Sequence, residues 1–407
     1  MNVTERFLSY VRYATPSSET SGLHPSNPKE RDFAEVLAKE LKAVGLSDAK
    51  TDEHGYVTAH LPASAGLEGA PVLGFIAHMD TSPDFSGAGV SPILHENYDG
   101  GDLPLGNSGR VLSVRDFPHL RDLSGRTLIT SDGTTLLGAD DKAGIAEIVT
   151  ALETLIGSGK PHGRIAICFT PDEEIGEGAD FFDLKEFGAD YAYTSDGSAE
   201  GEIEYENFNA AGAHFEIRGV NVHPGSAKGI MVNAGLIASE IASALPKDEI
   251  PAKTEGYEGF FHLTGIGGTV ERATLDYIVR DHDAKTFEKR LAYLRSVEKE
   301  FREKYGEGAV TPTVKEQYRN MKEIIDKVPF LIEYAREAVR RVGVAPIESP
   351  IRGGTDGARL SFMGLPCPNL GTGGYAFHGP FEHITVEGME KSVGILVELC
   401  ALFADRK

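Results

Sequence analysis

The sequence contains no tryptophan and only three cysteines among its 407 residues. Cys168, Cys367 and Cys400 are widely spaced and include no Cys-x-x-Cys pair, so they predict neither a disulfide framework nor a thiolate zinc site. Free thiols suit a reducing cytoplasm, which is the expected location. The N-terminus lacks a basic region followed by an apolar run, and no apolar stretch approaches the length of a membrane span. We therefore expect no export signal and no membrane partner.

Positive charge is also scarce, because 40 basic side chains face 62 acidic ones and the formal net charge is -22. A field of this sign repels the phosphates of nucleic acids, so nucleic acid is not an expected partner. A hydrophobic content of 41% and a charged content of 25% are close to the average of folded proteins and argue against disorder. The length exceeds the size at which one hydrophobic core keeps growing, which predicts two folding units.

Two different patterns along the chain support this division. The first part alternates apolar runs with amphipathic segments, including a helix over 33–44 and buried strands over 72–77, 164–170 and 191–194. This alternation predicts an α/β domain with a central sheet flanked by helices. From about residue 211 a second unit of strands and helices begins, and the first pattern returns near residue 327. We predict a catalytic domain made of 1–210 and 327–407, and an inserted α+β domain over 211–326.

Polar residues follow apolar strands at four points of the predicted catalytic domain, namely 78–80, 140–141, 172–174 and 196. The carboxyl ends of strands in an open α/β sheet are where ligands bind, so we expect a histidine and several carboxylates to meet at one rim. Such carboxylates repel one another unless cations neutralise them. Imidazole and carboxylate ligands suit zinc, and also manganese or cobalt. The charge of three liganding carboxylates and one hydroxide favours two divalent ions.

Each of these features has a simpler explanation when it is taken alone. His78 can be a hydrogen-bonded histidine at a strand end, and Asp140 with Asp141 can cap the following helix. Glu173 and Glu174 can be surface charge, the pair 196–197 can be an ordinary turn, and the histidine at 378 can be an exposed loop residue. Their shared position at strand ends favours the metal site for the first four.

The same residues lie in motifs that resemble those of the peptidase T family. The motifs are 78–81 (HMDT), 138–144 (GADDKAG), 171–176 (PDEEIG), 194–197 (TSDG), 206–210 (ENFNA), 221–225 (NVHPG), 351–357 (IRGGTDG) and 373–379 (GGYAFHG). Their order and spacing also match, and the similarity spans nearly the whole chain. The resemblance implies a zinc-peptidase catalytic domain with a mixed central sheet flanked by helices, and an inserted lid and dimerisation domain of ferredoxin-like type.

The resemblance also assigns the metal site residue by residue. It implies two zinc ions per subunit, for which manganese or cobalt are substitutes, bridged by Asp140. His78 and Asp196 would bind one ion, and Glu174 and His378 the other. Glu173 would be the general base that takes the proton of a zinc-activated bridging water, and Asp80 would orient the ring of His78. The peptide bond between Asp140 and Asp141 is expected to be cis.

Three further residues are expected to contact the substrate. The resemblance implies that His223 of the inserted domain reaches the active site of the partner subunit in a homodimer, whereas its simpler role is hydrogen bonding within a turn. Arg352 is the leading candidate to bind the carboxylate of a peptide, because its planar guanidinium matches a carboxylate with two donors. Arg280 is a second candidate, and its alternative is an ordinary salt bridge.

The expected activity is removal of the N-terminal residue from short peptides, chiefly tripeptides. The same metal site would serve an N-acyl-amino-acid deacylase or desuccinylase, because it only requires an amide. A catalytically silent binding protein on this scaffold would lack a metal ligand or the base. All of these are present, as His78, Asp140, Glu173, Glu174, Asp196 and His378.

Overall fold

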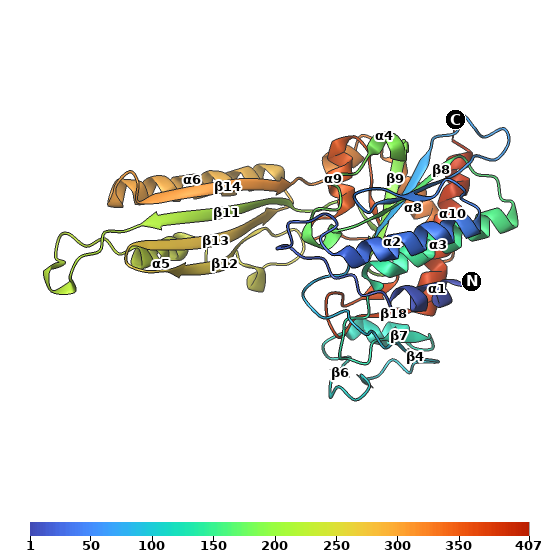
Figure 1. Ribbon diagram of the computed structural model, residues 1–407, viewed down its shortest axis with the longest axis horizontal. Coiled ribbons are helices and arrows are strands. Elements are labelled where there is room, and N and C mark those ends of the chain that lie inside the picture. The colour runs from blue at the N-terminus through green and yellow to red at the C-terminus, as the bar shows by residue number, and fades with distance from the viewer. Residues whose placement is uncertain (407) are drawn as a thin grey trace. The chain divides into compact units, whose positions relative to one another are not determined.

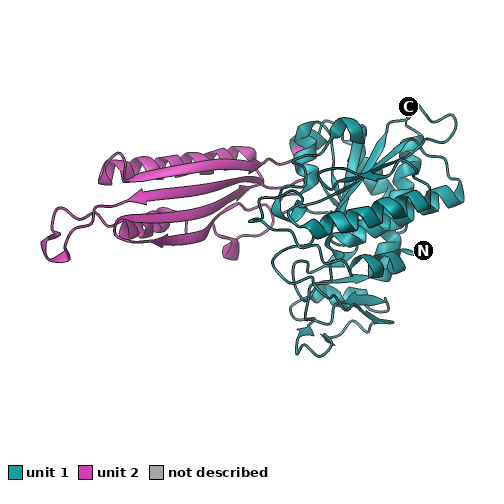
Figure 2. Cartoon of the chain, viewed as in Figure 1, with its two compact units in different colours: residues 1–205, 323–349, 355–407 teal, residues 206–322, 350–354 magenta. Residues whose placement is uncertain are grey.

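The computed structural model describes residues 1–406 and divides into two compact units (Figure 2). Unit 1 contains residues 1–205, 323–349 and 355–407, and unit 2 contains residues 206–322 and 350–354. The inserted unit therefore begins five residues before the predicted start at 211 and ends four residues before the predicted end at 326. It also takes in the short segment 350–354, which carries Arg352.

An eight-stranded mixed sheet forms the centre of unit 1 (Figure 1). Its spatial order is β1 (Lys50–Thr51), β2 (Val57–Leu61), β8 (Ile165–Thr170), β3 (Leu73–His78), β9 (Tyr191–Gly197), β16 (Asn369–Gly371), β10 (Glu202–Glu204) and β15 (Ile347–Glu348). The four strands β8, β3, β9 and β16 run parallel to one another. Every residue of β3 and β8 is buried, which is why both sequences are continuous apolar runs.

Helices pack around this sheet. They are α1 (Val3–Tyr10), α2 (Pro28–Val44), α3 (Ala139–Ser158), α4 (Leu184–Phe187), α8 (Phe330–Arg341), α9 (Asp356–Met363) and α10 (Val386–Ala404). Helix α3 contacts β3 and β9 on one side and α1, α2 and α10 on others. It is therefore buried on more than the single apolar stripe visible in its sequence, and small residues such as Ala143 and Ala146 allow the close packing. The mixed sheet flanked by helices confirms the predicted fold class.

A smaller layer of unit 1 contains two short sheets. One is four-stranded, in the order β17 (Gly374–Tyr375), β18 (His383–Thr385), β7 (Leu128–Thr130) and β4 (Ile93–His95), and the other pairs β5 (Leu103–Pro104) with β6 (Val111–Leu112). The 3₁₀ helix η1 (Pro118–Leu123) lies nearby in sequence. Tyr98, Leu105 and Leu128 belong to a separate small core here. The segment 84–109, which is rich in glycine, aspartate and proline, contains β4 and β5 and is thus partly a folded element.

Unit 2 has the chain order β11 (Asn209–Arg218), α5 (Ala234–Ala244), β12 (Phe260–Gly268), β13 (Arg272–Asp281), α6 (Ala284–Tyr305) and β14 (Val310–Tyr318). The strands form an antiparallel sheet in the order β12, β13, β11, β14, which is the β-α-β-β-α-β arrangement of ferredoxin-like folds. Alternate residues of β11, from Ala211 to Ile217, share one core with Ile237 of α5 and Leu294 of α6, so both helices cover the same face of the sheet. The short 3₁₀ helices η3 (Pro224–Ser226) and η4 (Pro251–Lys253) lie in loops, and α7 (Lys322–Ile325) follows β14.

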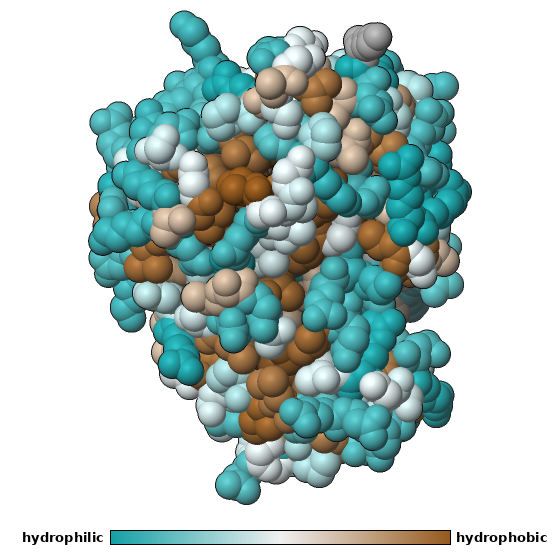
Figure 3. All heavy atoms as spheres, turned by 90° about the vertical axis from the view of Figure 1, so that its right-hand side faces the viewer, coloured by the Kyte–Doolittle hydropathy of each residue, from teal (hydrophilic) through white to brown (hydrophobic). Residues whose placement is uncertain are grey.

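Hydrophobic side chains do not gather into one apolar face on the surface shown in Figure 3, where they emerge at several places between hydrophilic ones. Among residues 1–406, no helix combines the length and apolar character that crossing a membrane requires.

Candidate metal centre

The parallel strands of unit 1 bring the predicted ligands to one edge of the sheet. Strand β3 ends at His78, and the neighbouring strand β8 ends at Thr170, just before the turn that carries Glu173 and Glu174. On the other side of β3, strand β9 carries Asp196 close to its end. Because parallel strands end at the same edge, three segments that are far apart in sequence converge there.

Asp140 lies between two histidines at this edge. Its Oδ1 is 2.9 Å from Nε2 of His78, and its Oδ2 is 3.1 Å from Nε2 of His378. The same nitrogen of His78 is 3.2 Å from Asp196, and that of His378 is 2.9 Å from Glu174. Each oxygen of one carboxylate thus faces a different histidine, and each histidine has a second carboxylate beside it. These are the residues that the family resemblance assigns to two ions, and their binding of metal stays a prediction.

Asp80 connects the histidine to the turn that carries the predicted base. Its Oδ1 lies 3.3 Å from Nδ1 of His78, whose Nδ1 is also 3.1 Å from the Asp80 carbonyl oxygen. The two carboxylate oxygens accept hydrogen bonds from the backbone amides of Glu173 and Glu174, at 3.0 and 3.1 Å. A buried carboxylate with these contacts can fix both the ring of His78 and the start of η2 (Glu173–Ile175).

The helix that carries Asp140 starts with an unusual backbone. The peptide bond between Asp140 and Asp141 is cis, which confirms the expectation. Asp141 points into the interior, where its carboxylate accepts hydrogen bonds from the amides of His78 at 3.1 Å and Gly144 at 3.2 Å. A β-carbon on Gly144 would lie 1.9 Å from the carbonyl oxygen of Ser195, so only glycine allows α3 to approach β9 this closely.

The loop that carries His378 has a less regular conformation. His378 has a φ of 64° and Ala376 a φ of 54°, in a region that non-glycine residues seldom adopt. The imidazole is partly exposed, and its Nδ1 lies 3.6 Å from a carboxylate oxygen of Asp84. Sequence periodicity gives no signal for such a residue, and only the family resemblance pointed to it.

Two buried carboxylates of the site had no separate prediction. Glu382 accepts hydrogen bonds from the amides of Leu137 at 2.6 Å, Gly138 at 2.8 Å and Asp140 at 3.0 Å. Asp356, at the start of α9, accepts a hydrogen bond from the hydroxyl of Thr170 at 2.8 Å. Burial raises the pKa of Glu382 to about 7 and that of Asp356 to about 7. Asp356 lies in the motif 351–357, which was a usable signal, whereas nothing in the local sequence marked Glu382.

Charge and hydrogen bonding at the centre fit two divalent cations. Burial and the charge of Asp140 raise the pKa of Glu174 to about 8, and one of its oxygens is buried without a hydrogen bond. Burial would lower the pKa of His78, but neighbouring carboxylates, led by Asp196, raise it well above its ordinary value. Hydrogen bonds to Asp140 and Glu174 raise the pKa of His378 to about 11. Two divalent cations held by these ligands would offset the negative charge that the carboxylates place here.

Alternative groupings of possible ligand atoms also occur around His78. His78, Asp140 and Glu174 offer ligand atoms that lie within 4.8 Å of one another, and so do His78, Asp141 and Asp196. The donors are imidazole nitrogens and carboxylate oxygens, which suit zinc, manganese and cobalt.

The three predicted substrate contacts all lie in unit 2. His223 is exposed just before η3, and its Nδ1 accepts a hydrogen bond from the amide of Gly225 at 3.1 Å. Arg280 on β13 donates to the carbonyls of Ala211 and Val279 and lies over the ring of Tyr318. The contact of His223 is the turn hydrogen bond that its simpler role predicts.

Arg352 is held by the loop around η4. Its guanidinium donates to the carbonyl oxygens of Gly256 at 2.6 Å, Glu258 at 3.1 Å and Thr254 at 3.3 Å, and it lies over the ring of Phe208. These contacts occupy several of its donors within unit 2. Binding of a carboxylate by Arg280 or Arg352 remains a prediction.

The fold and the cluster of histidine and carboxylates together define a metal-dependent hydrolase of the α/β class. The model of peptidase family M20/M25/M40 matches residues 133–401, and the chain is 54% identical over 405 residues to the peptidase T of Clostridium perfringens (strain 13 / Type A), with 99% of each chain covered. The chain therefore belongs to peptidase family M20/M25/M40.

Solved structures show the same fold at lower identity. A tripeptidase from Staphylococcus aureus subsp. aureus Mu50 superposes with a TM-score of 0.79 at 23% identity, covering 100% of this chain and 98% of the other. The aminopeptidase PepT from Bacillus cereus ATCC 10987 superposes with a TM-score of 0.76 at 24% identity, covering 99% and 98%. Both alignments extend through unit 1 and unit 2.

Proposed function

We propose that the chain is an aminopeptidase that removes the N-terminal residue from short peptides, chiefly tripeptides, with two zinc ions bound at the Asp140 cluster. The observation that carries the proposal is the position of the Asp140 carboxylate, with one oxygen facing His78 and the other facing His378. Full-length similarity to a peptidase T supports the substrate class.

The residues that would hold the ions are those already grouped around the two histidines. Asp140 would contact both ions, with His78 and Asp196 completing one set of ligands and Glu174 and His378 the other. Bound zinc supplies Lewis acidity that lowers the pKa of water towards neutrality and polarises a carbonyl group. Manganese or cobalt would supply the same chemistry to these ligands.

Glu173 is the proposed general base. It lies beside Glu174 on η2, and the hydrogen bond from its amide to Asp80 fixes its backbone. Its carboxylate would accept the proton of the attacking water and deliver a proton to the leaving amine. Burial and the charge of Asp196 raise the pKa of Glu173 well above its ordinary value, so its proton affinity responds strongly to the charge around it.

We also propose that Arg280 and Arg352 bind the carboxylate of the peptide, and that the enzyme acts as a homodimer formed through unit 2. Exposed apolar side chains on unit 2, including Ile230, Leu236 and Ile266, support an interface there, and β12 is an edge strand with an unpaired side. His223 of one subunit would then help to stabilise the oxyanion in the partner. A cytoplasmic location agrees with the three cysteines, all of which are free and buried.

The proposal is tested with zinc-loaded protein and one unblocked tripeptide, its dipeptide and tetrapeptide relatives, and its N-acetylated form. Mass spectrometry should detect release of a single N-terminal residue, fastest from the free tripeptide and abolished by a chelator. Cleavage of the N-acetylated form alone would replace the proposal with a deacylase. Binding of the peptides without any cleavage would identify a catalytically silent member of the family.

A further inference from the structure

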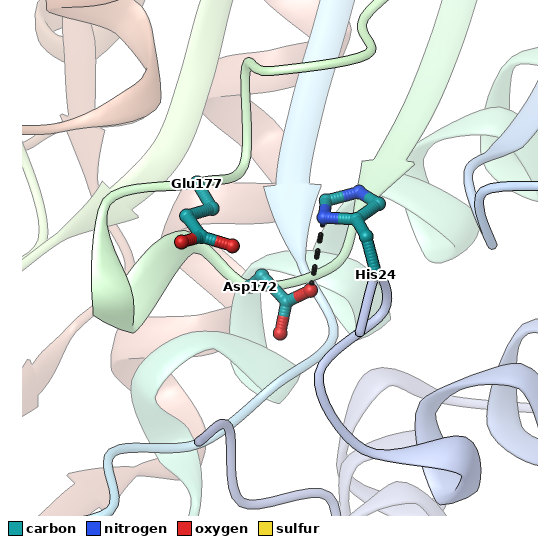
Figure 4. Close-up of side chains that lie close together, drawn as sticks. All are labelled: His24, Asp172 and Glu177. Atoms are coloured by element: carbon teal, nitrogen blue, oxygen red, sulfur yellow. Dashed lines mark ion pairs between the residues drawn. The ribbon is translucent and has the colours of Figure 1, made fainter. Parts of the chain in front are cut away.

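A second cluster of ligand-type side chains lies outside the Asp140 centre in unit 1. His24, Asp172 and Glu177 offer ligand atoms that all lie within 4.8 Å of one another. In Figure 4 the imidazole of His24 turns one nitrogen towards the carboxylate of Asp172, and the carboxylate of Glu177 lies beside it. None of the three residues is part of the proposed dinuclear site.

Polar atoms in this cluster are buried without hydrogen bonds. The side chain of His24 is 9% exposed and that of Asp172 is 0% exposed. Nδ1 of His24 lies 3.2 Å from Oδ2 of Asp172, yet neither ring nitrogen of His24 makes a hydrogen bond, and Oδ1 of Asp172 makes none either. Buried polar atoms are nearly always satisfied in folded proteins, so an unsatisfied nitrogen of His24 beside the unsatisfied Oδ1 of Asp172 points to a missing partner.

The side chains of His24 and Asp172 and the backbone of Glu177 are held in position by their surroundings. The ring of His24 packs between those of Tyr56 and Phe181, with centroids 5.8 and 4.7 Å away. Oδ2 of Asp172 accepts a hydrogen bond from the amide of Ser26 at 2.7 Å, which ties residues 24–26 to the turn after β8. The turn closes on itself because the amide of Glu177 donates to the carbonyl of Asp172 at 2.9 Å. With these positions fixed, only the side chain of Glu177 has to move for the cluster to bind an ion.

Arg359 of α9 contacts this turn but does not bind the carboxylates of the cluster. Arg359 donates to the carbonyl of Gly176 at 2.6 Å and pairs with Asp180. Within residues 1–406, no hydrogen bond or ion pair engages the carboxylate of Glu177, and the carboxylate of Asp172 has an ion-pair contact with His24 alone.

We propose that His24, Asp172 and Glu177 form a third metal site, which binds a divalent cation of the zinc class. One imidazole nitrogen and two carboxylate oxygens match zinc or manganese, whereas calcium and magnesium prefer oxygen ligands alone. Ligand atoms around zinc are separated by about 3 to 4 Å, so binding draws Glu177 slightly inward from its present position. Two carboxylates balance the charge of one divalent ion, and solvent completes the coordination.

This ion would act on the turn that carries Glu173 and Glu174, without contact to the reacting groups. Asp172 directly precedes Glu173 and Glu174, and Glu177 follows them three residues later. The turn carries the proposed base Glu173. A cation shared with His24 therefore fixes both ends of this turn to residues 24–26. Its role is to position this turn, and it takes no part in the reaction.

The test is the zinc content of metal-stripped protein after equilibration with buffered free zinc, measured by inductively coupled plasma mass spectrometry. Wild-type protein should bind one ion more than either His24→Gln or Glu177→Gln. His54→Gln is the matched control, because its ring stacks on Phe181 beside the cluster but belongs to no ligand group, and it should bind as much zinc as wild type. Glu177→Gln keeps the test valid if His24→Gln fails to fold, since Glu177 is only partly buried.

Anomalous diffraction at the zinc edge locates the ions independently of activity. A peak should lie between His24 and Asp172 in wild-type crystals and be absent in Glu177→Gln, while density at the Asp140 centre is unchanged. Equal zinc content in wild type, His24→Gln and Glu177→Gln would overturn the third site. If wild-type crystals show the peak at His24 and none at the Asp140 centre, the dinuclear proposal is contradicted and the third site is retained.

Discussion

Glu382 accepts a hydrogen bond from the backbone amide of Asp140 at 3.0 Å, although the two residues are far apart in sequence. Its other oxygen accepts from the amides of Leu137 and Gly138, so one buried carboxylate fixes the backbone that presents Asp140. A glutamine at 382 would turn an amide group towards at least one of these donors.

We therefore expect Glu382→Gln to lower zinc affinity at the Asp140 centre by about 10- to 100-fold, the usual effect of losing a group that orients a ligand. Competition with a calibrated chelator measures the affinity. The control is Glu390→Gln, at an exposed position of α10, which should bind zinc as wild type does. Unchanged affinity in Glu382→Gln would mean that the Asp140 loop keeps its position without this carboxylate.

Neighbouring residues on η2 should respond differently to the same substitution. Glu173→Gln should retain both zinc ions and lose about 100- to 10,000-fold in kcat, because it removes only proton transfer. Glu174→Gln should bind less zinc, because Glu174 lies 2.9 Å from His378 and is a proposed ligand. Zinc content and kcat measured on the two variants separate the roles, and full activity in Glu173→Gln would remove it from the mechanism.

Much of this centre could be predicted from the sequence because its residues follow strands whose apolar runs are unmistakable. His78, Asp196 and the pair at 173–174 belong to this class, and the buried strands β3, β8 and β9 place them together. Glu382 could not be predicted, because its partners lie more than 240 residues earlier and no local periodicity records that contact. His24 was missed for the same reason, since its approach to Asp172 depends on the contact of residues 24–26 with the turn after β8.

The inserted unit shows a different limit of sequence reasoning. Its helices and strands follow clear periodic patterns, as in β13, along which buried and less buried positions alternate. Strand β12 gives a weaker signal, because its apolar residues are interrupted by glycines and five of its nine positions are exposed. The contacts of Arg352 with backbone carbonyls could not be predicted from the sequence, because every residue type supplies a carbonyl group.

Recognition of the peptide carboxylate is tested by replacing each arginine. Arg280→Lys and Arg352→Lys keep the charge but lose the planar pair of donors, so KM for a free tripeptide should rise by about 10-fold or more while kcat changes little. The same peptide with a C-terminal amide serves as the control, and its KM should be unaffected by either change. An equal rise in KM for the free tripeptide and its C-terminal amide would mean that the substitution alters the structure of the site. For Arg352 this would follow from the loss of its contacts with backbone carbonyls.

The proposed exchange of His223 between subunits predicts complementation. His223→Ala and Glu173→Gln should each be nearly inactive alone, with His223→Ala losing about 100-fold in kcat. Co-expressed at equal amounts, they should recover about a quarter of wild-type activity, because half of the dimers are mixed and each mixed dimer has one complete site. Sedimentation verifies that dimers form. If activity stays at the level of the separate variants, His223 does not act in the partner's site.

Acid stability should depend on His383, which is fully buried in β18 and lies 3.0 Å from His119 between the two Nε2 atoms. Burial lowers the pKa of His383 to about 4, whereas an unfolded histidine has a pKa of about 6.5. The folded protein thus excludes a proton that the unfolded chain accepts, so the stability from the neutral ring is complete above pH 6.5 and is lost as the pH falls towards 4.

Urea unfolding followed by circular dichroism measures this effect at pH 8 and pH 4.5. The free energy of unfolding should fall by about 2 to 3 kcal/mol more in wild type than in His383→Gln, since the variant has no proton to take up at this position. The difference between the proteins at pH 8 gives the packing cost of the substitution and is subtracted. If the difference in the free energy of unfolding between wild type and His383→Gln is the same at both pH values, protonation of His383 does not limit acid stability. The buried carboxylates and the other histidines would then account for the pH dependence alone.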